Sequence, residues 1–243
     1  MNNSIAEQCK RLYISAFHDD EEFTDYLFSL FFESSCKYLL EGETVVSMLF
    51  AMDVTCGKLK GKYVYAVATL EQYRGKGYMS RLFDSLTAEL KNQYDFLCLK
   101  PMSESLFDYY ARLGFETAFY KKSFSLNSFS NSLTLVEVKN PNEISNIRKS
   151  LINESFVDYS SDFLNLLLSY CTMLTDNPLE PKVFVVKERL SGKVKEVLGD
   201  YNLLPDEYKN KTLLTVGNEY RFAMVKKLKN ISLNNCYLGF ALD

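Results

Sequence analysis

Apolar residues recur at intervals of three and four positions over the first part of the chain. This spacing predicts an amphipathic helix over residues 5–17 and a second helix that begins at Glu21. His18-Asp19-Asp20 lies between the two apolar runs and predicts a short break. The chain is therefore expected to open with a pair of helices.

After this pair, the apolar period switches between that of strands and that of helices. Apolar runs rich in β-branched and aromatic residues predict strands at residues 37–40, 45–52, 63–69, 96–99 and 115–122. Helical spacing predicts helices at residues 79–90 and 104–113, with Gly114 as a C-terminal cap of the second. This order of elements predicts a mixed α/β (α+β) fold, with a central sheet flanked by helices.

A polar, serine-rich segment at residues 121–132 is interpreted as a linker between two domains, 1–125 and 133–243. In the second domain, Asn140-Pro141 has the cap and first-position proline of a helix start. Further apolar patterns predict a helix at 163–171, a hairpin of strands 183–187 and 194–198, and strands at 221–225 and 236–241.

Composition narrows the class of protein. With 47% hydrophobic residues, the chain has the apolar share of a globular protein. Its net charge of -3 provides no net positive field, which argues against a broad surface for nucleic acid or for anionic membranes.

The sequence holds few residues of the kinds that bind metals, and its N-terminal residues do not have the pattern of a secretion signal. The six cysteines stand apart without a C-x-x-C pair, and His18 is the one histidine, so we expect reduced thiols and no metal. The N-terminal residues show no signal-peptide pattern, and the longest apolar-rich stretch, near 163–174, is too short to cross a bilayer. We therefore expect a cytoplasmic protein.

The segment with the clearest chemical meaning joins the strand at 63–69 to the helix at 79–90. Gly75 and Gly77 there would let backbone N–H groups converge on an anion, and Arg74 and Lys76 would add positive charge. An ordinary tight turn with solvated basic residues is the alternative. The flanking strand and helix favour a phosphate site.

Two common phosphate-binding motifs do not fit this segment. A dinucleotide-binding fold needs a third glycine, but position 80 is serine. A P-loop needs G-x-x-x-x-G-K-[ST], and residues 57–63 have neither that spacing nor the hydroxyl.

Two motifs resemble those of the GNAT superfamily of N-acetyltransferases. Gln72-Tyr73-Arg74-Gly75-Lys76-Gly77 is similar to the superfamily's Q/R-x-x-G-x-G/A acetyl-CoA signature. Tyr109-Tyr110-Ala111-Arg112-Leu113-Gly114-Phe115 looks like its Y-x-x-x-G-F helix ending. The resemblance covers about residues 60–122 and implies a GNAT fold for the first domain, with acetyl-CoA as co-substrate.

The resemblance also implies how the donor would bind. The pyrophosphate of acetyl-CoA would lie on the amides of residues 74–79, and the pantetheine arm would pair with the backbone of Val67 and Thr69. A backbone N–H near Ala68 or Thr69 would polarise the thioester carbonyl. The implied acetyl-CoA residues are Val67, Ala68, Thr69, Arg74, Gly75, Lys76, Gly77, Tyr78 and Met79.

The implied reaction is direct attack on the acetyl carbonyl by a primary amine, carried by a small molecule or a peptide. Tyr110, four residues before Gly114, matches the family's general acid, which protonates the departing CoA thiolate. Tyr109 is the second candidate. The alternative for Tyr110 is packing, because it lies on the apolar stripe of its helix.

The sequence leaves the general base open. No carboxylate lies in residues 63–69, which favours deprotonation through water. Acidic candidates are the cluster Asp19–Glu22 and the terminal residue Asp243. The two-domain layout resembles tandem-GNAT enzymes such as the enhanced-intracellular-survival aminoglycoside acetyltransferases, and this resemblance implies a second GNAT-like lobe without a CoA motif and the terminal carboxylate as base.

Two other functions fit the same sequence. A degenerate GNAT domain would bind acyl-CoA without turnover, as a sensor or interaction module. A transferase on the same fold would use another acyl or aminoacyl donor. The intact glycine pair and Tyr110 favour an active acetyl-CoA-dependent enzyme.

Overall fold

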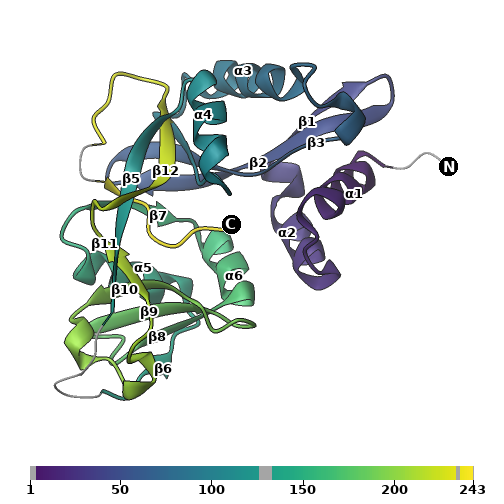
Figure 1. Ribbon diagram of the computed structural model, residues 1–243. Coiled ribbons are helices and arrows are strands. Elements are labelled where there is room, and N and C mark those ends of the chain that lie inside the picture. Colours follow the sequence, from purple (N-terminus) through teal and green to yellow (C-terminus); the bar gives the residue numbers. More distant parts are fainter. Residues whose placement is uncertain (1–3, 126–132, 234–235, 243) are drawn as a thin grey trace. The chain divides into compact units, whose positions relative to one another are not determined.

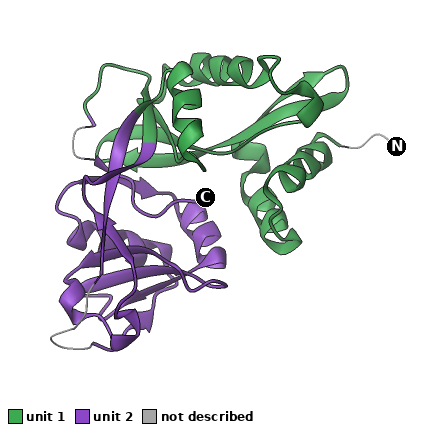
Figure 2. Ribbon diagram, viewed as in Figure 1, with its two compact units in different colours: residues 1–116, 224–232 green, residues 117–223, 233–243 purple. Residues whose placement is uncertain are grey.

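The computed structural model describes residues 4–125, 133–233 and 236–242. The chain divides into two compact units (Figure 2): unit 1 is Met1–Glu116 with Met224–Ser232, and unit 2 is Thr117–Ala223 with Leu233–Asp243. The first two of the three boundaries fall inside strands, β5 (Glu116–Phe124) and β12 (Tyr220–Lys227), and the third lies in the loop after Ser232. The chain therefore first leaves unit 1, and later re-enters it, within regular structure.

The helices and strands of unit 1 follow the order that the sequence predicts. They are α1 (Ile5–Phe17), α2 (Glu21–Ser35), β1 (Cys36–Glu41), β2 (Thr44–Cys56), β3 (Leu59–Thr69), the 3-10 turn η1 (Glu71–Tyr73), α3 (Tyr78–Leu90), β4 (Phe96–Leu99) and α4 (Glu104–Arg112). β2 and β3 are longer than predicted. They form a hairpin in which Lys62 lies opposite Asp53 and pairs with it at 3.0 Å, so its polar residues are stabilised by cross-strand contacts.

Unit 1 is built on a mixed sheet with strand order β1-β2-β3-β4-β12. The β3–β4 pair is parallel and the other pairs are antiparallel, with Met224–Lys227 of β12 bonded to β4. Helices α3 and α4 cover one face of the sheet, and α1 and α2 cover the other (Figure 1). The core under α3 and α4 includes Phe83, Leu86 and Leu97, all at most 1% exposed.

β3 and β4 separate part-way along their length. Their pairing covers only Gly61–Tyr63, although β3 continues to Thr69. Beyond the last pair, β3 bulges: Tyr65 lies opposite Phe50 and Ala68 opposite Met48, so two residues of β3 face one residue of β2. Ala66, one of those two, has φ 53°. The sheet is therefore open on the β4 side of β3, next to a strained residue.

Unit 2 has a less regular order than its sequence pattern predicts. Its elements are β6 (Val136–Glu137), α5 (Pro141–Leu151), β7 (Ser155–Tyr159), α6 (Ser161–Tyr170), β8 (Cys171–Thr175), β9 (Val183–Glu188), β10 (Val194–Gly199), the 3-10 turns η2 (Tyr201–Leu203) and η3 (Asp206–Tyr208), β11 (Leu213–Val216) and β13 (Cys236–Tyr237). A four-stranded antiparallel sheet has the order β10-β9-β8-β6, β11 pairs with β5, and β13 pairs with β7.

The predicted start of α5 is confirmed, since the Asn140 side chain caps Asn142 N and proline follows. Two other predictions need correction, four strands were missed, and residues 126–132 of the predicted linker lie outside the described residues. Lys121–Phe124 belongs to β5 rather than to a linker, because it pairs with β11. Strands β6, β7, β8 and β11 were not predicted. The strand expected at 236–241 ends at Tyr237, and Gly239, at φ 84°, turns the chain out of the extended conformation.

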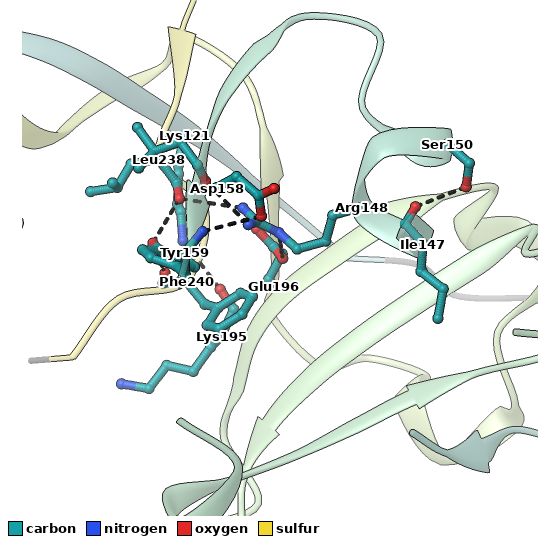
Figure 3. Close-up of polar contacts among 11 residues, drawn as sticks. Lys121, Ile147, Arg148, Ser150, Asp158, Tyr159, Lys195, Glu196, Leu238 and Phe240 are labelled. Atoms are coloured by element: carbon teal, nitrogen blue, oxygen red, sulfur yellow. Dashed lines mark hydrogen bonds and ion pairs between the residues drawn. The ribbon is translucent and has the colours of Figure 1, made fainter. Parts of the chain in front are cut away.

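Unit 2 buries an ion pair that the sequence pattern does not reveal (Figure 3). Arg148 of α5 and Glu196 of β10 are both fully buried, with Arg148 Nε 3.8 Å from Glu196 Oε2. The Arg148 guanidinium also donates to the carbonyls of Val157 and Leu238, at 3.1 and 3.5 Å. A Cβ at Gly239 would lie 2.5 Å from Arg148 Nη2, so glycine is required there for space as well as for its φ.

Candidate active site

The turn between β3 and α3 has the backbone that its glycines predict. Gly75 and Gly77 have φ of 72° and 79°, and a Cβ at either position would have nothing within 4 Å. Glycine is therefore needed there for backbone conformation rather than for space.

This turn leaves the start of α3 without a protein cap. Gly77 is the N-cap residue, no side chain accepts from the first amides, and the first turn carries no acid. By contrast, Ser4 caps α1 and Asp20 caps α2 through side-chain oxygens. The free amides at the positive end of α3 are suited to an anion.

A cavity of about 500 Å³ begins at this helix end. It is lined by Val67, Thr69, Tyr73, Arg74, Gly75, Gly77, Tyr78, Met79, Ser80, Leu106, Tyr109 and Tyr110. Most of the expected donor residues therefore meet at one cavity, together with Tyr110 and its alternative Tyr109. Ala68 and Lys76 do not line it, and Asp243 lies outside the described residues.

Basic and aromatic side chains surround the turn. Arg74 Nε donates to the Thr69 carbonyl at 3.1 Å, which folds the arginine back toward the end of β3. Lys76 lies over the Tyr73 ring at 5.4 Å, and Arg81 lies over the Tyr78 ring at 4.3 Å. This arrangement supplies positive charge beside the uncapped helix end.

Two features of the cavity wall on β3 were missed by sequence reasoning. The Thr69 hydroxyl hydrogen-bonds to the buried Ser47 hydroxyl at 2.7 Å, which fixes its rotamer. The bulge at Ala66 changes the direction of the backbone just before Val67. Neither has a sequence signal, because both depend on the register of β2 against β3.

Tyr110 extends from α4 into the cavity wall and is 7% exposed. Its ring packs edge-on against Phe83 and Phe115, with centroids 6.1 and 5.9 Å apart. Burial raises the pKa of this phenol, so it carries its proton at neutral pH. Among the described residues, no side chain or carbonyl is hydrogen-bonded to its hydroxyl, an arrangement that suits a ligand as partner.

A second polar group lies on the opposite face of the sheet, under α1. Tyr13 is fully buried, its hydroxyl donates a hydrogen bond to the Asp19 carboxylate, and its hydroxyl oxygen lies 3.0 Å from that of Tyr65. Asp19 follows α1 and is half-buried, whereas its neighbour Asp20 caps α2. Within the acidic cluster Asp19–Glu22 that the sequence singled out, Asp20 therefore caps a helix, whereas Asp19 contacts a buried network. The two tyrosines, 52 residues apart, were not foreseen.

The comparison with protein families decides what this unit is. Residues 1–118 match the family described as acetyltransferase (GNAT) domain. These residues form a GNAT domain. The glycine turn, the open edge of β3 and Tyr110 all lie within it.

Solved structures similar to this chain extend beyond the GNAT domain. A GCN5-related N-acetyltransferase from Anabaena variabilis ATCC 29413 has a TM-score of 0.67 at 13% identity, over 92% of this chain and 70% of that one. Eis1 from Mycobacterium abscessus has a TM-score of 0.65 at 9% identity, over 93% and 72%. A GCN5-related N-acetyltransferase from Kribbella flavida has a TM-score of 0.62 at 13% identity, over 91% and 69%.

At these identities the similarity shows the fold, and it covers both units. The predicted GNAT fold is thereby confirmed, as is the resemblance to GNAT N-acetyltransferases with two lobes. A search of curated proteins found no match. In the described parts of the chain, no cluster of three or more His, Cys, Asp or Glu side chains could hold a metal ion, and no helix is long and apolar enough to span a membrane.

Proposed function

We propose that the GNAT domain transfers the acetyl group of acetyl-CoA to a primary amine of a small molecule or peptide. The observation that carries this proposal is a single cavity that joins the uncapped start of α3 to the hydroxyl of Tyr110 along the open edge of β3. Its volume of about 500 Å³ is within the range of small-molecule sites.

In this proposal the chain binds the donor mainly through backbone groups. The amides of Tyr78 and Met79, at the positive end of α3, would hold the pyrophosphate, and Arg74 and Lys76 would add charge. The backbone of Val67 and Thr69, which β4 does not cover, would pair with the pantetheine arm as an added strand. A backbone N–H near Ala68 or Thr69 would polarise the thioester carbonyl.

In the reaction, the amine nitrogen attacks the acetyl carbon, and the carbon–sulfur bond breaks with its electron pair on sulfur. Tyr110 is proposed to donate its proton to the departing thiolate. Burial raises the pKa of its phenol, so at neutral pH the group carries the proton that this role requires. The amine loses its proton to a general base, and the carboxylate of Asp243 in that role stays a prediction from the sequence.

The test is the Tyr110→Phe variant, which keeps the ring contacts with Phe83 and Phe115 and removes only the hydroxyl. We expect kcat to fall at least about tenfold, because a general acid typically contributes about 10²–10⁴-fold. Acetyl-CoA affinity, measured by titration calorimetry, should stay within about twofold, because the phosphate-binding turn is unchanged. Tyr109→Phe is the matched control.

The assay measures CoA released from acetyl-CoA with a panel of primary amines, under conditions where the chemical step limits turnover. Full turnover by Tyr110→Phe would remove the proposed acid. Acetyl-CoA binding without CoA release for any amine would indicate an acyl-CoA-binding module instead. If other acyl-CoA thioesters raise the melting temperature more than acetyl-CoA does, the acetyl donor is wrong.

A further inference from the structure

The hydroxyls of Ser47 and Thr69 form a pair in the cavity wall with a defined direction. Their oxygens are 2.7 Å apart. Ser47 is 0% exposed, and among the described residues its hydroxyl has no other hydrogen-bond partner. If Thr69 were the donor, the Ser47 hydrogen would be buried without an acceptor, which is costly. Ser47 is therefore the donor, and the Thr69 hydroxyl keeps its own hydrogen for another acceptor.

The Thr69 side chain lies on the side of the sheet that carries the cavity. Val67 and Thr69 are two residues apart in β3, so their side chains point to the same face. Val67 packs against the core under α3 and α4, which cover that face in Figure 1. Thr69 lines the cavity together with residues of both helices. Its hydroxyl hydrogen is therefore available to a molecule bound there.

The Thr69 backbone presents a second hydrogen at the open edge of β3. Leu70 N donates to the Val46 carbonyl at 2.9 Å, so these two residues form a hydrogen-bonded pair across the strands. The adjacent pair, Thr69 opposite Ser47, is then non-hydrogen-bonded, and the N–H and C=O of Thr69 point away from β2. The pairing of β4 with β3 ends at Tyr63, so β4 does not take up these groups.

One of these backbone groups is already engaged. Arg74 Nε donates to the Thr69 carbonyl at 3.1 Å. The groups of Thr69 that remain for a ligand are its N–H and its hydroxyl hydrogen, and both are donors. A carbonyl oxygen has two lone pairs and accepts two such hydrogen bonds. Thr69 is therefore suited to a ligand that carries a carbonyl at this point of the cavity.

We propose that the Thr69 hydroxyl, oriented by Ser47, donates a hydrogen bond to an amide carbonyl of the pantetheine arm. This inference rests on the proposed binding of acetyl-CoA. Thr69 is the last residue of β3, and the turn that would hold the pyrophosphate follows it. The carbonyl in question is therefore the one nearer the phosphates. Ser47 acts on the ligand only through Thr69 and is a positioning residue.

The test measures coenzyme A binding by titration calorimetry in the full chain. Thr69→Val keeps the shape of the side chain and removes the hydroxyl, whereas Thr69→Ser keeps the hydroxyl and removes the methyl group. Thr55→Val is the matched control, because Thr55 is an exposed residue of β2 that does not line the cavity.

We expect Thr69→Val to raise the Kd for coenzyme A about fivefold, in keeping with the net worth of one hydrogen bond. Thr69→Ser and Thr55→Val should stay within about twofold of wild type. A wild-type Kd in Thr69→Val would overturn the proposal. Equal weakening by Thr69→Val and Thr69→Ser would overturn it as well, because packing of the methyl group would then be the cause.

A second ligand separates the pantetheine arm from the phosphates. Adenosine 3′,5′-bisphosphate has the nucleotide part of coenzyme A and lacks the arm, so Thr69→Val should leave its Kd within about twofold of wild type. Equal weakening of both ligands would overturn the proposal, because the change would then act through the phosphate-binding turn. Where the bisphosphate binds too weakly to titrate, the comparison of Thr69→Val with Thr69→Ser decides alone.

The role of Ser47 is tested by a double-mutant cycle. Ser47→Ala should raise the Kd for coenzyme A about threefold in wild type and have no further effect in Thr69→Val, because its influence passes through the Thr69 hydroxyl. The same increase in both backgrounds would overturn the positioning role. Melting temperatures check that each variant is folded at the temperature of the titration.

Failure of the proposed function gives a different result. If wild-type protein binds no coenzyme A, both proposals are overturned together. If it binds coenzyme A with the expected dependence on Thr69 but releases none from acetyl-CoA with any amine, the proposed transfer alone is overturned. Binding and turnover that do not depend on the Thr69 hydroxyl overturn the present inference alone.

Discussion

The buried pair Arg148–Glu196 allows a quantitative test of what stabilises unit 2. Replacing Arg148 with Met leaves the Glu196 carboxylate in a fully buried site without its cation. Replacing Glu196 with Gln leaves a guanidinium that still donates hydrogen bonds to two carbonyls. The guanidinium also stays 5.0, 5.2 and 5.1 Å from the ring centroids of Phe156, Tyr159 and Phe240. The two changes therefore have unequal costs.

Breaking a buried ion pair by removing one partner costs about 3–5 kcal/mol. Because the guanidinium keeps its carbonyl and ring contacts, we expect Glu196→Gln near the lower end, about 3 kcal/mol, and Arg148→Met near the upper end, about 5 kcal/mol. The double variant Arg148→Met/Glu196→Leu removes both charges and keeps the apolar volume, so its stability should lie within about 1 kcal/mol of wild type.

The assay is urea unfolding followed by circular dichroism, since the chain has no tryptophan to report by fluorescence. Because the chain has two compact units, each can unfold in its own transition. The change in unfolding free energy is read from the transition whose midpoint the single variants shift. Costs below about 1 kcal/mol for both single variants would refute the reasoning, as would a double variant whose cost is the sum of the two.

Two further predictions concern stability. Gly61→Ala should destabilise the protein by about 1–3 kcal/mol in urea unfolding, because the new Cβ would lie 2.3 Å from the fully buried Phe96 ring. The double variant Gly61→Ala/Phe96→Leu should recover part of the lost stability. An unshifted unfolding midpoint for Gly61→Ala would contradict this close packing. Burial opposes ionisation of Glu188, but hydrogen bonds, foremost from Lys195 at 2.5 Å, lower its pKa from 4.5 to about 2. Because the pKa of Glu188 is lower in the folded state, its ionised carboxylate stabilises the fold above pH 4.5, and this stability is lost as the pH falls to 2. The free energy of unfolding of wild type should therefore fall by up to about 3 kcal/mol over this range. Glu188→Gln should lack that part of the acid dependence. Identical stability–pH curves for the two proteins would refute the assignment.

The sequence predicted those parts of the fold that depend on local patterns. The strand Phe96–Leu99 and the start of α5 were found because a continuous apolar run and an Asn-Pro cap each specify one local structure. Strand β8 was missed because Cys171 continues the apolar period of the preceding helix, and β7 because its five residues lie between two helices.

The features of the candidate site fall into the same two groups, those with a local sequence signal and those without one. The glycine turn and Tyr110 have sequence signals, since positive φ and the helix ending select particular residue types. The bulge at Ala66 and the contact of Tyr13 with Tyr65 depend on strand register and on helix packing between distant segments. Such features appear only when the chain has folded, because neither alanine nor tyrosine marks them in the sequence.

The last strand of the unit 1 sheet has a consequence for how the protein is made. Residues 224–227 pair with β4, although more than one hundred residues separate the two segments along the chain. During synthesis, the N-terminal part emerges first and must wait with one edge of β4 unpaired, a state in which strands readily join other chains. A protein truncated after residue 118, where the family match ends, would keep that unpaired edge permanently. Expression of the acetyltransferase portion by itself would therefore favour aggregation, and recombinant work should retain the later segment.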